Sequence, residues 1–382
     1  MSRAFDTIDR AKLMLILREE VQLTEDDLRI CQSLLADTSL TVKLGEVLSD
    51  PFQTTIGTPQ GDGLSPILFA VYLESAIRLV RAQAMPRPAA DVGIPPELIY
   101  ADDTDFPSTS QSFLRHLEQI IPPTIGPNHG YHLRANDTKW ERTAIVPPAD
   151  GRIESRLTDE QQAWRKTKKL GSQLGDEEDI ERRMLLATLA FKSLRKLWEQ
   201  RKVTRIGTRM QAYNALVLSV LLYNCGTWGI TQGVMERLEV YHRRHLREVL
   251  GVRTRDMSNA ELYKRCKTSP LQGRIAWERW SLFGHVLRLA LDTPAQLAMD
   301  YYCQLSEGEV ISQGRPITTL PVILFRAYRK YRAYTRERGW SVLTETRMLT
   351  ELRKRAADKQ KWRELAAFIC DSKHKLDVLD SE

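Results

Sequence analysis

The feature that most constrains this chain is a change of hydrophobic periodicity near residue 160. Before it, short β-like runs alternate with helical segments and with loops rich in glycine and proline. Beyond it, apolar residues recur almost throughout at the spacing of amphipathic helices, as over 232–250 and 272–291. The pattern predicts an α+β amino-terminal part followed by a mostly helical remainder.

Local signals mark several early helices. Asp9 and Thr24 stand where they can cap two helices, because their side chains can accept hydrogen bonds from the free N–H groups of a first turn. Helical spacing is also present over 65–83 and over 111–121, after which a polar loop follows. We therefore expect four helices before residue 125.

Length and periodicity together suggest three parts. The chain has 382 residues, 42% of them hydrophobic, which is enough to bury two or three cores. We expect an α+β part over 1–150 and a helical, basic part over 151–300. The remaining residues, 301–382, read as a carboxy-terminal helical region whose role the sequence leaves open.

The sequence favours a protein of the nucleus or cytoplasm with no membrane partner. Its longest apolar runs, such as Leu216–Tyr223, are far shorter than the about 18 residues of a membrane span. The amino terminus lacks the apolar segment of a secretory signal. Five scattered cysteines with no Cys-x-x-Cys pair argue against a disulfide framework and against a cysteine-rich zinc module.

Positive charge is concentrated in the middle of the chain. Residues 190–300 hold 19 Lys and Arg against 9 Asp and Glu, interleaved with tryptophans and tyrosines. This mixture suits a polyanion with stackable bases, but helices with solvated arginine faces would give the same composition. If nucleic acid binds here, the candidates are the cations at the start of this region, Lys192, Arg195, Lys196, Arg201 and Lys202.

Two histidines, His242 and His245, lie three positions apart on a predicted helix. This spacing can present two metal ligands on one helix face. Because no third or fourth ligand stands nearby in the sequence, packed or solvated histidines are the stronger interpretation.

Two adjacent carboxylates stand between short β-like runs. Asp102 and Asp103 lie between 97–100 and 104–106, so we expect a tight hairpin with both carboxylates at its tip. Neighbouring carboxylates repel each other unless a cation lies between them, and a hard divalent ion fills that role in many proteins. The pair is the best candidate for a metal site, with a solvated turn as the alternative.

Two further segments precede these carboxylates. The loop Gly57-Thr58-Pro59-Gln60-Gly61-Asp62-Gly63 leads into the predicted helix over 65–83, and its glycines allow a planar substrate to approach the backbone closely. Near the amino terminus stands Ala4-Phe5-Asp6.

The order of these three segments resembles motifs A, B and C of reverse transcriptases, specifically those of non-LTR retrotransposons. Motif A is similar to Ala4-Phe5-Asp6, motif B to Pro59-Gln60-Gly61-Asp62 with the Leu-Ser-Pro that follows, and motif C to Tyr100-Ala101-Asp102-Asp103. Asn136-Asp137-Thr138-Lys139 is similar to motif D, and Lys169-Leu170-Gly171-Ser172 to the motif E turn. Phe283-Gly284-His285 resembles, more loosely, a stretch common after the polymerase core.

The resemblance implies an RNA-directed DNA polymerase, with a palm of antiparallel sheet and helices followed by a helical thumb. Its partners would be an RNA template, a DNA primer and a dNTP, and its cofactor Mg²⁺, with Mn²⁺ as a substitute. By position, Asp102 and Asp103 would bind the metal and act in catalysis, and Lys139 could donate a proton to the pyrophosphate.

The resemblance also implies a nucleotide pocket. Phe5 matches the aromatic residue that lies under the sugar of the incoming nucleotide, while Pro59, Gln60 and Gly61 would line the pocket. Two alternatives stay open, since Phe5 could be a core residue and Lys139 an exposed strand residue.

One departure from the family pattern concerns the mechanism. Motif A reads Asp-x-x-x-Ala-Phe-Asp, and its first aspartate, an essential metal ligand, would stand one position before Met1. The fingers motifs have no counterpart either, so the chain resembles an element truncated within motif A, whose amino-terminal portion another chain could supply. We expect an impaired polymerase, or alternatively a catalytically inactive nucleic-acid-binding remnant, or a product that does not fold stably.

Overall fold

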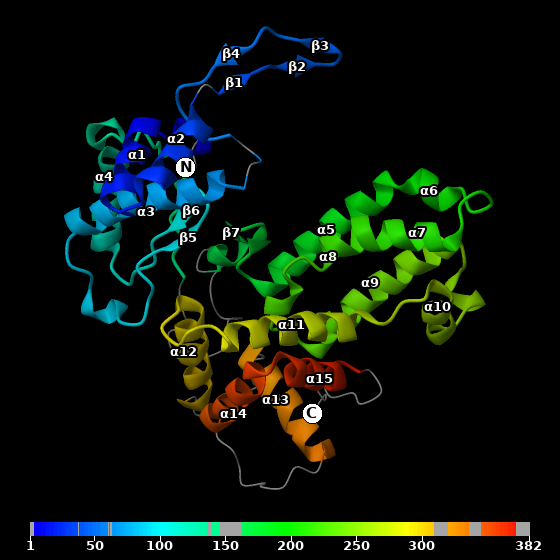
Figure 1. The fold of residues 1–382 in the computed structure, drawn as a ribbon. Coiled ribbons are helices and arrows are strands. Elements are labelled where there is room, and N and C mark those ends of the chain that lie inside the picture. Colours follow the sequence, from blue (N-terminus) through cyan, green and yellow to red (C-terminus); the bar gives the residue numbers. More distant parts are fainter. Residues whose placement is uncertain are drawn as a thin grey trace. The chain divides into compact units, whose positions relative to one another are not determined.

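The computed structural model describes residues 4–36, 38–59, 61, 63–135, 140–145, 162–308, 320–335 and 345–371 (Figure 1). The chain divides into two compact units, Met1–Arg142 and Thr143–Glu382. Both contain helices and small antiparallel strand pairs, which agrees with the expected mixture of helix and strand. None of the helices in the described ranges is long and apolar enough to cross a membrane.

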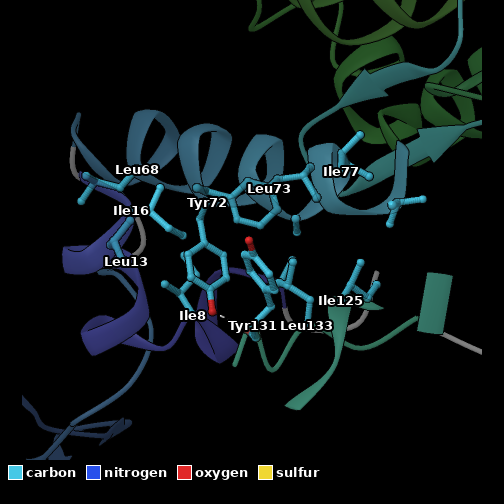
Figure 2. Close-up of a cluster of buried hydrophobic side chains, with 14 of the residues drawn as sticks. Ile8, Leu13, Ile16, Leu68, Tyr72, Leu73, Ile77, Ile125, Tyr131 and Leu133 are labelled. Carbon is cyan, nitrogen blue, oxygen red and sulfur yellow. Dashed lines mark hydrogen bonds between the residues drawn. The ribbon is translucent and has the colours of Figure 1, made fainter. Parts of the chain in front are cut away.

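Helices form the core of the first unit. α3 (Ser65–Gln83) packs against both α1 (Arg10–Glu19) and α4 (Gln111–Ile125), and α2 (Glu25–Leu35) packs against α1. Short 3₁₀ turns lie at η1 (Ala4–Thr7), η2 (Ala89–Asp91) and η3 (Pro127–His129). Figure 2 shows the apolar side chains between these helices, among them Ile8, Leu13, Ile16, Tyr72 and Tyr131.

The first turns of α1 and α2 are capped as predicted. The Asp9 carboxylate accepts a hydrogen bond from the Lys12 N–H at 2.8 Å, and Thr24 Oγ1 accepts one from the Asp27 N–H at 3.2 Å. The Thr24 hydroxyl also donates to the Asp27 carboxylate at 2.6 Å. Each cap satisfies an N–H group that the helix itself leaves free.

The strands of the first unit occur only in antiparallel pairs. β1 (Ser39–Leu40) pairs with β4 (Phe52–Gln53), and β2 (Lys43–Leu44) pairs with β3 (Val47–Leu48). These four strands make one β-ribbon that extends away from the helices of this unit (Figure 1). β5 (Leu98–Tyr100) pairs with β6 (Asp103–Asp105) in a second hairpin.

In the described residues of the second unit, the regular structure is helical apart from the pair β7 (Lys168–Lys169) and β8 (Ser172–Gln173). Its first helical group is η6 (Ala163–Lys166), α5 (Asp176–Ser193), α6 (Arg195–Glu199), α7 (Ile206–Ala212), the π-helical η7 (Tyr213–Leu218), α8 (Ser219–Leu221), η8 (Cys225–Thr227), α9 (Gln232–Leu250), η9 (Thr254–Asp256), α10 (Asn259–Cys266) and α11 (Leu271–Leu287). The last group is α12 (Pro294–Gly308), α13 (Leu320–Thr335), α14 (Glu345–Ala357) and α15 (Lys359–Cys370).

Three helices of the last group, α12, α14 and α15, pack onto α11. A buried cluster joins Trp280 and Phe283 of α11 to Trp362 of α15, and the Trp362 indole N–H donates to the Trp280 carbonyl at 2.9 Å. Gly284 lies directly under this indole, which a Cβ atom at that position would strike. The contact therefore needs a glycine at 284, because only a residue without a side chain leaves room for the ring.

Candidate functional site

The Tyr-x-Asp-Asp segment forms the tight hairpin that the sequence predicts. Tyr100 lies opposite Asp103 in the β5–β6 pair, so only Ala101 and Asp102 form the turn. Ala101 has a φ of 50°, in the left-handed region that a two-residue hairpin turn uses. Asp102 is therefore at the tip, whereas Asp103 begins the returning strand. The prediction that both carboxylates stand at the tip was wrong for Asp103, because the turn is shorter than expected.

The hairpin is lightly packed. Asp102 is half-buried and Asp103 is exposed, and the three residues of β5 are all exposed, Tyr100 at 68%. A sheet of two strands covers neither of its faces, so its apolar side chains stay in contact with water. Within the described residues, this hairpin holds Asp102 through strand pairing more than through a core.

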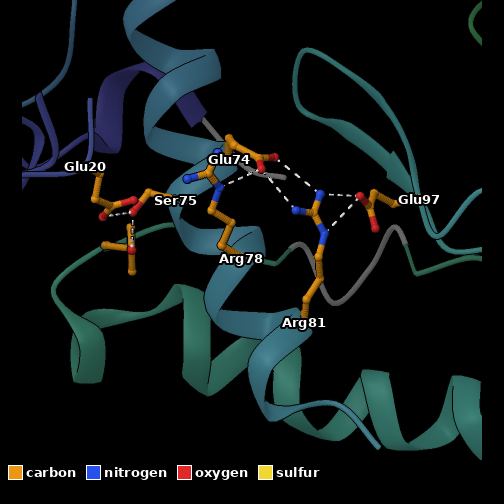
Figure 3. A network of polar contacts seen from close by, with 7 residues as sticks. Glu20, Glu74, Ser75, Arg78, Arg81 and Glu97 are labelled. Carbon is orange, nitrogen blue, oxygen red and sulfur yellow. Dashed lines mark hydrogen bonds and ion pairs between the residues drawn. The ribbon is translucent and has the colours of Figure 1, made fainter. Parts of the chain in front are cut away.

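An ion-pair network fastens the start of the hairpin to α3. Arg81 forms an ion pair with Glu97, the residue immediately before β5, and a second one with Glu74 of α3 at 3.0 Å (Figure 3). Arg78 also pairs with Glu74, at 2.9 Å. The hydrogen bond to Glu97 raises the pKa of Arg81 above its ordinary value. Because α3 follows directly from the glycine-rich loop, the network links the hairpin to the helix that carries this loop.

The glycine-rich loop is seated on η1 and the residue that follows it. The Gly57 N–H donates to the Ile8 carbonyl at 2.8 Å, and the Thr58 N–H donates to the Phe5 carbonyl at 3.0 Å. Gly57 has a φ of 76°, and a Cβ atom there would lie 3.0 Å from the Asp6 backbone. Only glycine satisfies both conditions. The segments that resemble motifs A and B thus lie directly against each other.

Arg10, which sequence reasoning missed, holds the same loop in place through hydrogen bonds from its guanidinium group. Its Nε donates to the Gly57 carbonyl at 2.8 Å, and its Nη1 donates to the carbonyls of Leu35 and Thr54 at 2.6 and 2.7 Å. Burial lowers the pKa of this guanidinium. No sequence signal separates Arg10 from any other cation in a first helical turn, since its partners lie 25 to 47 positions away.

The structure places two of the predicted nucleotide-binding residues, Phe5 and Pro59, against α3. Phe5 is half-buried, with its ring centroid 4.5 Å from that of Phe69 on α3. The Pro59 carbonyl accepts a hydrogen bond from Ser65 Oγ at 2.6 Å, which closes the loop onto the start of α3. Gly61 is exposed, with a φ of 96°, and Gln60 lies outside the described residues.

The candidate metal ligands do not form a complete donor set. No three His, Cys, Asp or Glu side chains in the described ranges stand close enough to share a metal ion. A hard divalent cation takes six or so oxygen ligands, several of them charged. Asp102 and Asp103 therefore do not complete such a centre with other described residues. Lys139, the predicted proton donor, falls outside the described ranges.

The predicted nucleic-acid-binding residues are all exposed, and they lie around α6. Lys192 is in the last turn of α5, while Arg195 and Lys196 begin α6. Arg195 is paired with Glu199 at 2.6 Å. Lys202 and Arg201 follow α6, and Arg201 donates to the Glu248 carbonyl in the last turn of α9 at 3.1 Å.

His242 and His245 are packed in the core of the second unit, as the stronger sequence interpretation held. His242 is fully buried and its Nδ1 lies 2.9 Å from the Tyr213 hydroxyl, and the His245 ring stacks on Phe191 at 4.2 Å. Burial lowers the pKa of His242 to about 3 and that of His245 to about 4. Both rings are therefore neutral near pH 7.

The segment that resembles motif E forms a turn at Leu170-Gly171, between β7 and β8. Arg183 of α5 donates to the Gly171 carbonyl at 2.5 Å, and the Gln173 N–H donates to the buried Asp179 carboxylate at 2.9 Å. The Trp228 indole N–H reaches the same carboxylate at 3.1 Å. This network ties the turn firmly to the helical core.

A scan against models of known protein families found no match, and a search of curated proteins found none either. The resemblance to reverse transcriptases therefore rests on the motifs quoted above.

Proposed function

We propose that this chain is the palm and thumb part of an RNA-directed DNA polymerase of the non-LTR retrotransposon type. The observation that carries the proposal is the β5–β6 hairpin, which presents Asp102 at its turn and Asp103 next to it. The loop of residues 57–59 lies against Phe5, so the segments similar to motifs A and B are neighbours, as the proposal requires.

Each group of residues would have the role that the resemblance indicates. Asp102 and Asp103 would supply two carboxylates toward Mg²⁺ or Mn²⁺, with the remaining acidic ligand from outside the described residues. Phe5, Pro59, Gln60 and Gly61 would line the dNTP pocket, and Lys139 would act at the leaving pyrophosphate. Lys192, Arg195, Lys196, Arg201 and Lys202 would contact the RNA template and DNA primer.

One observation favours a second candidate function, which is binding of nucleic acid without catalysis. The described carboxylates include no group of three that could share a cation. A chain with an incomplete donor set can still hold a template–primer, because binding depends on cations such as Lys192 and Arg201. The two candidates differ only in nucleotidyl transfer.

Primer extension on a homopolymer RNA template, with Mg²⁺ and with Mn²⁺, separates them. The chain is compared with a form lengthened upstream so that an aspartate stands directly before Met1. We expect the lengthened form to extend primers at least about 100-fold faster than its variant in which the added aspartate is replaced by asparagine, because a missing carboxylate displaces the ion. Asp102→Asn in the lengthened form should abolish extension.

Asp105→Asn is the matched control, since Asp105 lies at the other end of the same hairpin, opposite Leu98. It should keep the rate within about threefold, as expected for a carboxylate outside the reacting centre. Equal losses from Asp102→Asn and Asp105→Asn would contradict a polymerase site at this hairpin. Duplex binding by both forms, without extension by either, would favour the second candidate.

A further inference from the structure

An open cavity of about 810 Å³ lies beside the carboxy-terminal half of α9 in the second unit. Its charged lining consists of five arginines and one glutamate, which are Arg201, Arg243, Arg244, Arg247, Arg253 and Glu248. Five positive charges less one negative charge leave a formal charge of +4. We call this cavity the arginine pocket.

Three separate segments build the arginine pocket. Arg243, Arg244 and Arg247 lie on adjoining turns of α9, whose spacing places them on one side of the helix. Arg201 follows α6, and Arg253 precedes η9. Because segments about 40 to 50 positions apart converge here, the cluster is a product of the tertiary fold and not of a single charged run.

Most of the positive charge in the pocket has no internal counter-charge. Arg243 is paired with Glu236 at 2.6 Å, with Glu239 more distant at 4.0 Å. Arg247 donates to Asn259 Oδ1 at 2.7 Å, and its buried Nε has no hydrogen-bond partner. Arg244 has neither an ion pair nor a hydrogen bond to any residue in the described ranges. Like charges brought this close favour an external anion.

Helix capping explains only part of the cluster. The last carbonyls of α9 attract cations, and Arg201 donates to one of them, that of Glu248, at 3.1 Å. Arg247 lies in the last turn of α9, where the helix dipole favours a cation. Arg244 lies about one turn earlier, so the end of the helix does not account for its charge, and an anionic ligand in the pocket would give it a partner.

We propose that the arginine pocket binds the sugar–phosphate backbone of a nucleic-acid duplex. A guanidinium group offers paired N–H donors that match the oxygens of a phosphate. No aromatic side chain lines the pocket, so it has no platform on which unstacked bases could lie. Its contacts are therefore with the backbone and are independent of base sequence. The choice of nucleic acid among polyanions rests on the proposed function.

Fluorescence anisotropy with a labelled RNA–DNA hybrid duplex tests the proposal. In Arg244→Gln/Arg247→Gln we expect duplex binding to weaken at least about tenfold. The slope of log Kd against log salt should fall by about two, one for each lost phosphate contact. The control is Lys359→Gln/Arg363→Gln, which removes the same charge from exposed residues of α15 in the same unit. It should stay within about twofold of the wild type, as expected for cations that contact no phosphate. Equal weakening in the two double variants would overturn the pocket as the binding site.

Two further measurements test whether the duplex binds through the charges of the pocket and whether the ligand is nucleic acid. Arg244→Lys/Arg247→Lys keeps both positive charges and should keep most of the duplex binding. If this variant loses as much binding as the double glutamine variant and also has a lower Tm, the proposal is overturned. Tripolyphosphate, a free source of the same chemistry, should compete only at millimolar concentration, and displacement of the duplex at micromolar concentration would overturn the assignment to nucleic acid. Binding is measured in EDTA without dNTP, so its outcome is independent of primer extension.

Discussion

The two units of this protein differ in what holds their chain in place. In the first unit, every residue of β1 to β5 is exposed, and the core is formed by the helices together with Ile8, Tyr131 and Leu133. In the second unit, Trp198, Trp228 and Trp280 are buried at 2% exposure or less, and charged residues such as Asp179 lie in buried networks. The hairpin that carries Asp102 and Asp103 is thus lightly packed, whereas the turn that resembles motif E is bound to the densely packed helical unit.

The contrast has a simple physical cause. An isolated pair of strands satisfies the hydrogen bonds between its two members but buries neither face, whereas helices that pack in groups bury a whole stripe of side chains. Stability should therefore respond strongly to core changes in the second unit and weakly to changes on the hairpins of the first.

The largest expected effect tests the packing of the second unit. Trp280 is fully buried, with its ring 5.4 Å from that of Trp362 and 5.9 Å from that of Phe283. Trp280→Ala should lower the free energy of unfolding by about 3–5 kcal/mol. Trp277→Ala, on the same helix but 40% exposed, should cost less than about 1 kcal/mol. Urea unfolding followed by circular dichroism measures both, and equal costs would remove the contrast.

Acid should weaken the second unit by a separate route. The folded-state pKa values of His242 and His245, about 3 and about 4, lie below the roughly 6.5 of an unfolded chain. Between about pH 6.5 and pH 4 the unfolded chain therefore takes up protons that the folded unit excludes, so stability falls as pH falls. At pH 5 the loss is of the order of 2 kcal/mol per histidine.

Urea unfolding at pH 8 and at pH 5 measures this loss. His245→Phe should reduce the difference, because phenylalanine does not titrate. His129→Gln in the first unit should leave it unchanged, since His129 is exposed. A wild-type stability that is the same at both pH values would contradict the buried neutral histidines.

A smaller loss of stability is expected in the first unit, where the core can be compared with the β5–β6 hairpin. The side chains of Tyr72 and Tyr131 lie side by side in this core (Figure 2). The Tyr72 hydroxyl donates to the Tyr131 carbonyl and accepts from the Asp9 N–H at 3.2 Å. Tyr72→Phe leaves these groups without their partner and should cost about 1–3 kcal/mol in urea unfolding. Tyr100→Phe on exposed β5 should change stability by less than about 0.5 kcal/mol. If the two variants lose the same free energy of unfolding, the core of this unit contributes no more to stability than its hairpin does.

Local signals predicted much of the fold. The expected helices over 65–83 and 232–250 coincide with α3 and α9, because Pro66 and Thr231 mark their starts and Gly251 marks the end of α9. The helix over 111–121 was predicted to end too early. α4 continues through Pro122 and Pro123 to Ile125, since the buried Thr124 and Ile125 pack into the core, and tertiary packing overrides a local stop signal.

In the candidate site, too, the parts that could be predicted are those whose residues lie close together in the sequence. The β5–β6 hairpin could be predicted because its turn, its strands and its carboxylates lie within eight consecutive residues, 98–105. The contact of Gly57 with Ile8 and the reach of Arg10 to Thr54 could not, because they join residues more than 40 positions apart. For the arginine pocket, the spacing of Arg243 and Arg247 was visible in the sequence, but the approach of Arg201 was not.

The seat of the glycine-rich loop on η1 has a consequence for how this protein can change over time. The Thr58 N–H donates to Phe5, and the close approach at Gly57 leaves no space for a methyl group. A substitution at Gly57 would separate the loop from η1 whatever residue stands at position 5. Because the atoms that Gly57 approaches belong to the backbone, the side chains at positions 5 and 6 can change without disturbing this contact, whereas position 57 must stay glycine for as long as the loop contacts η1.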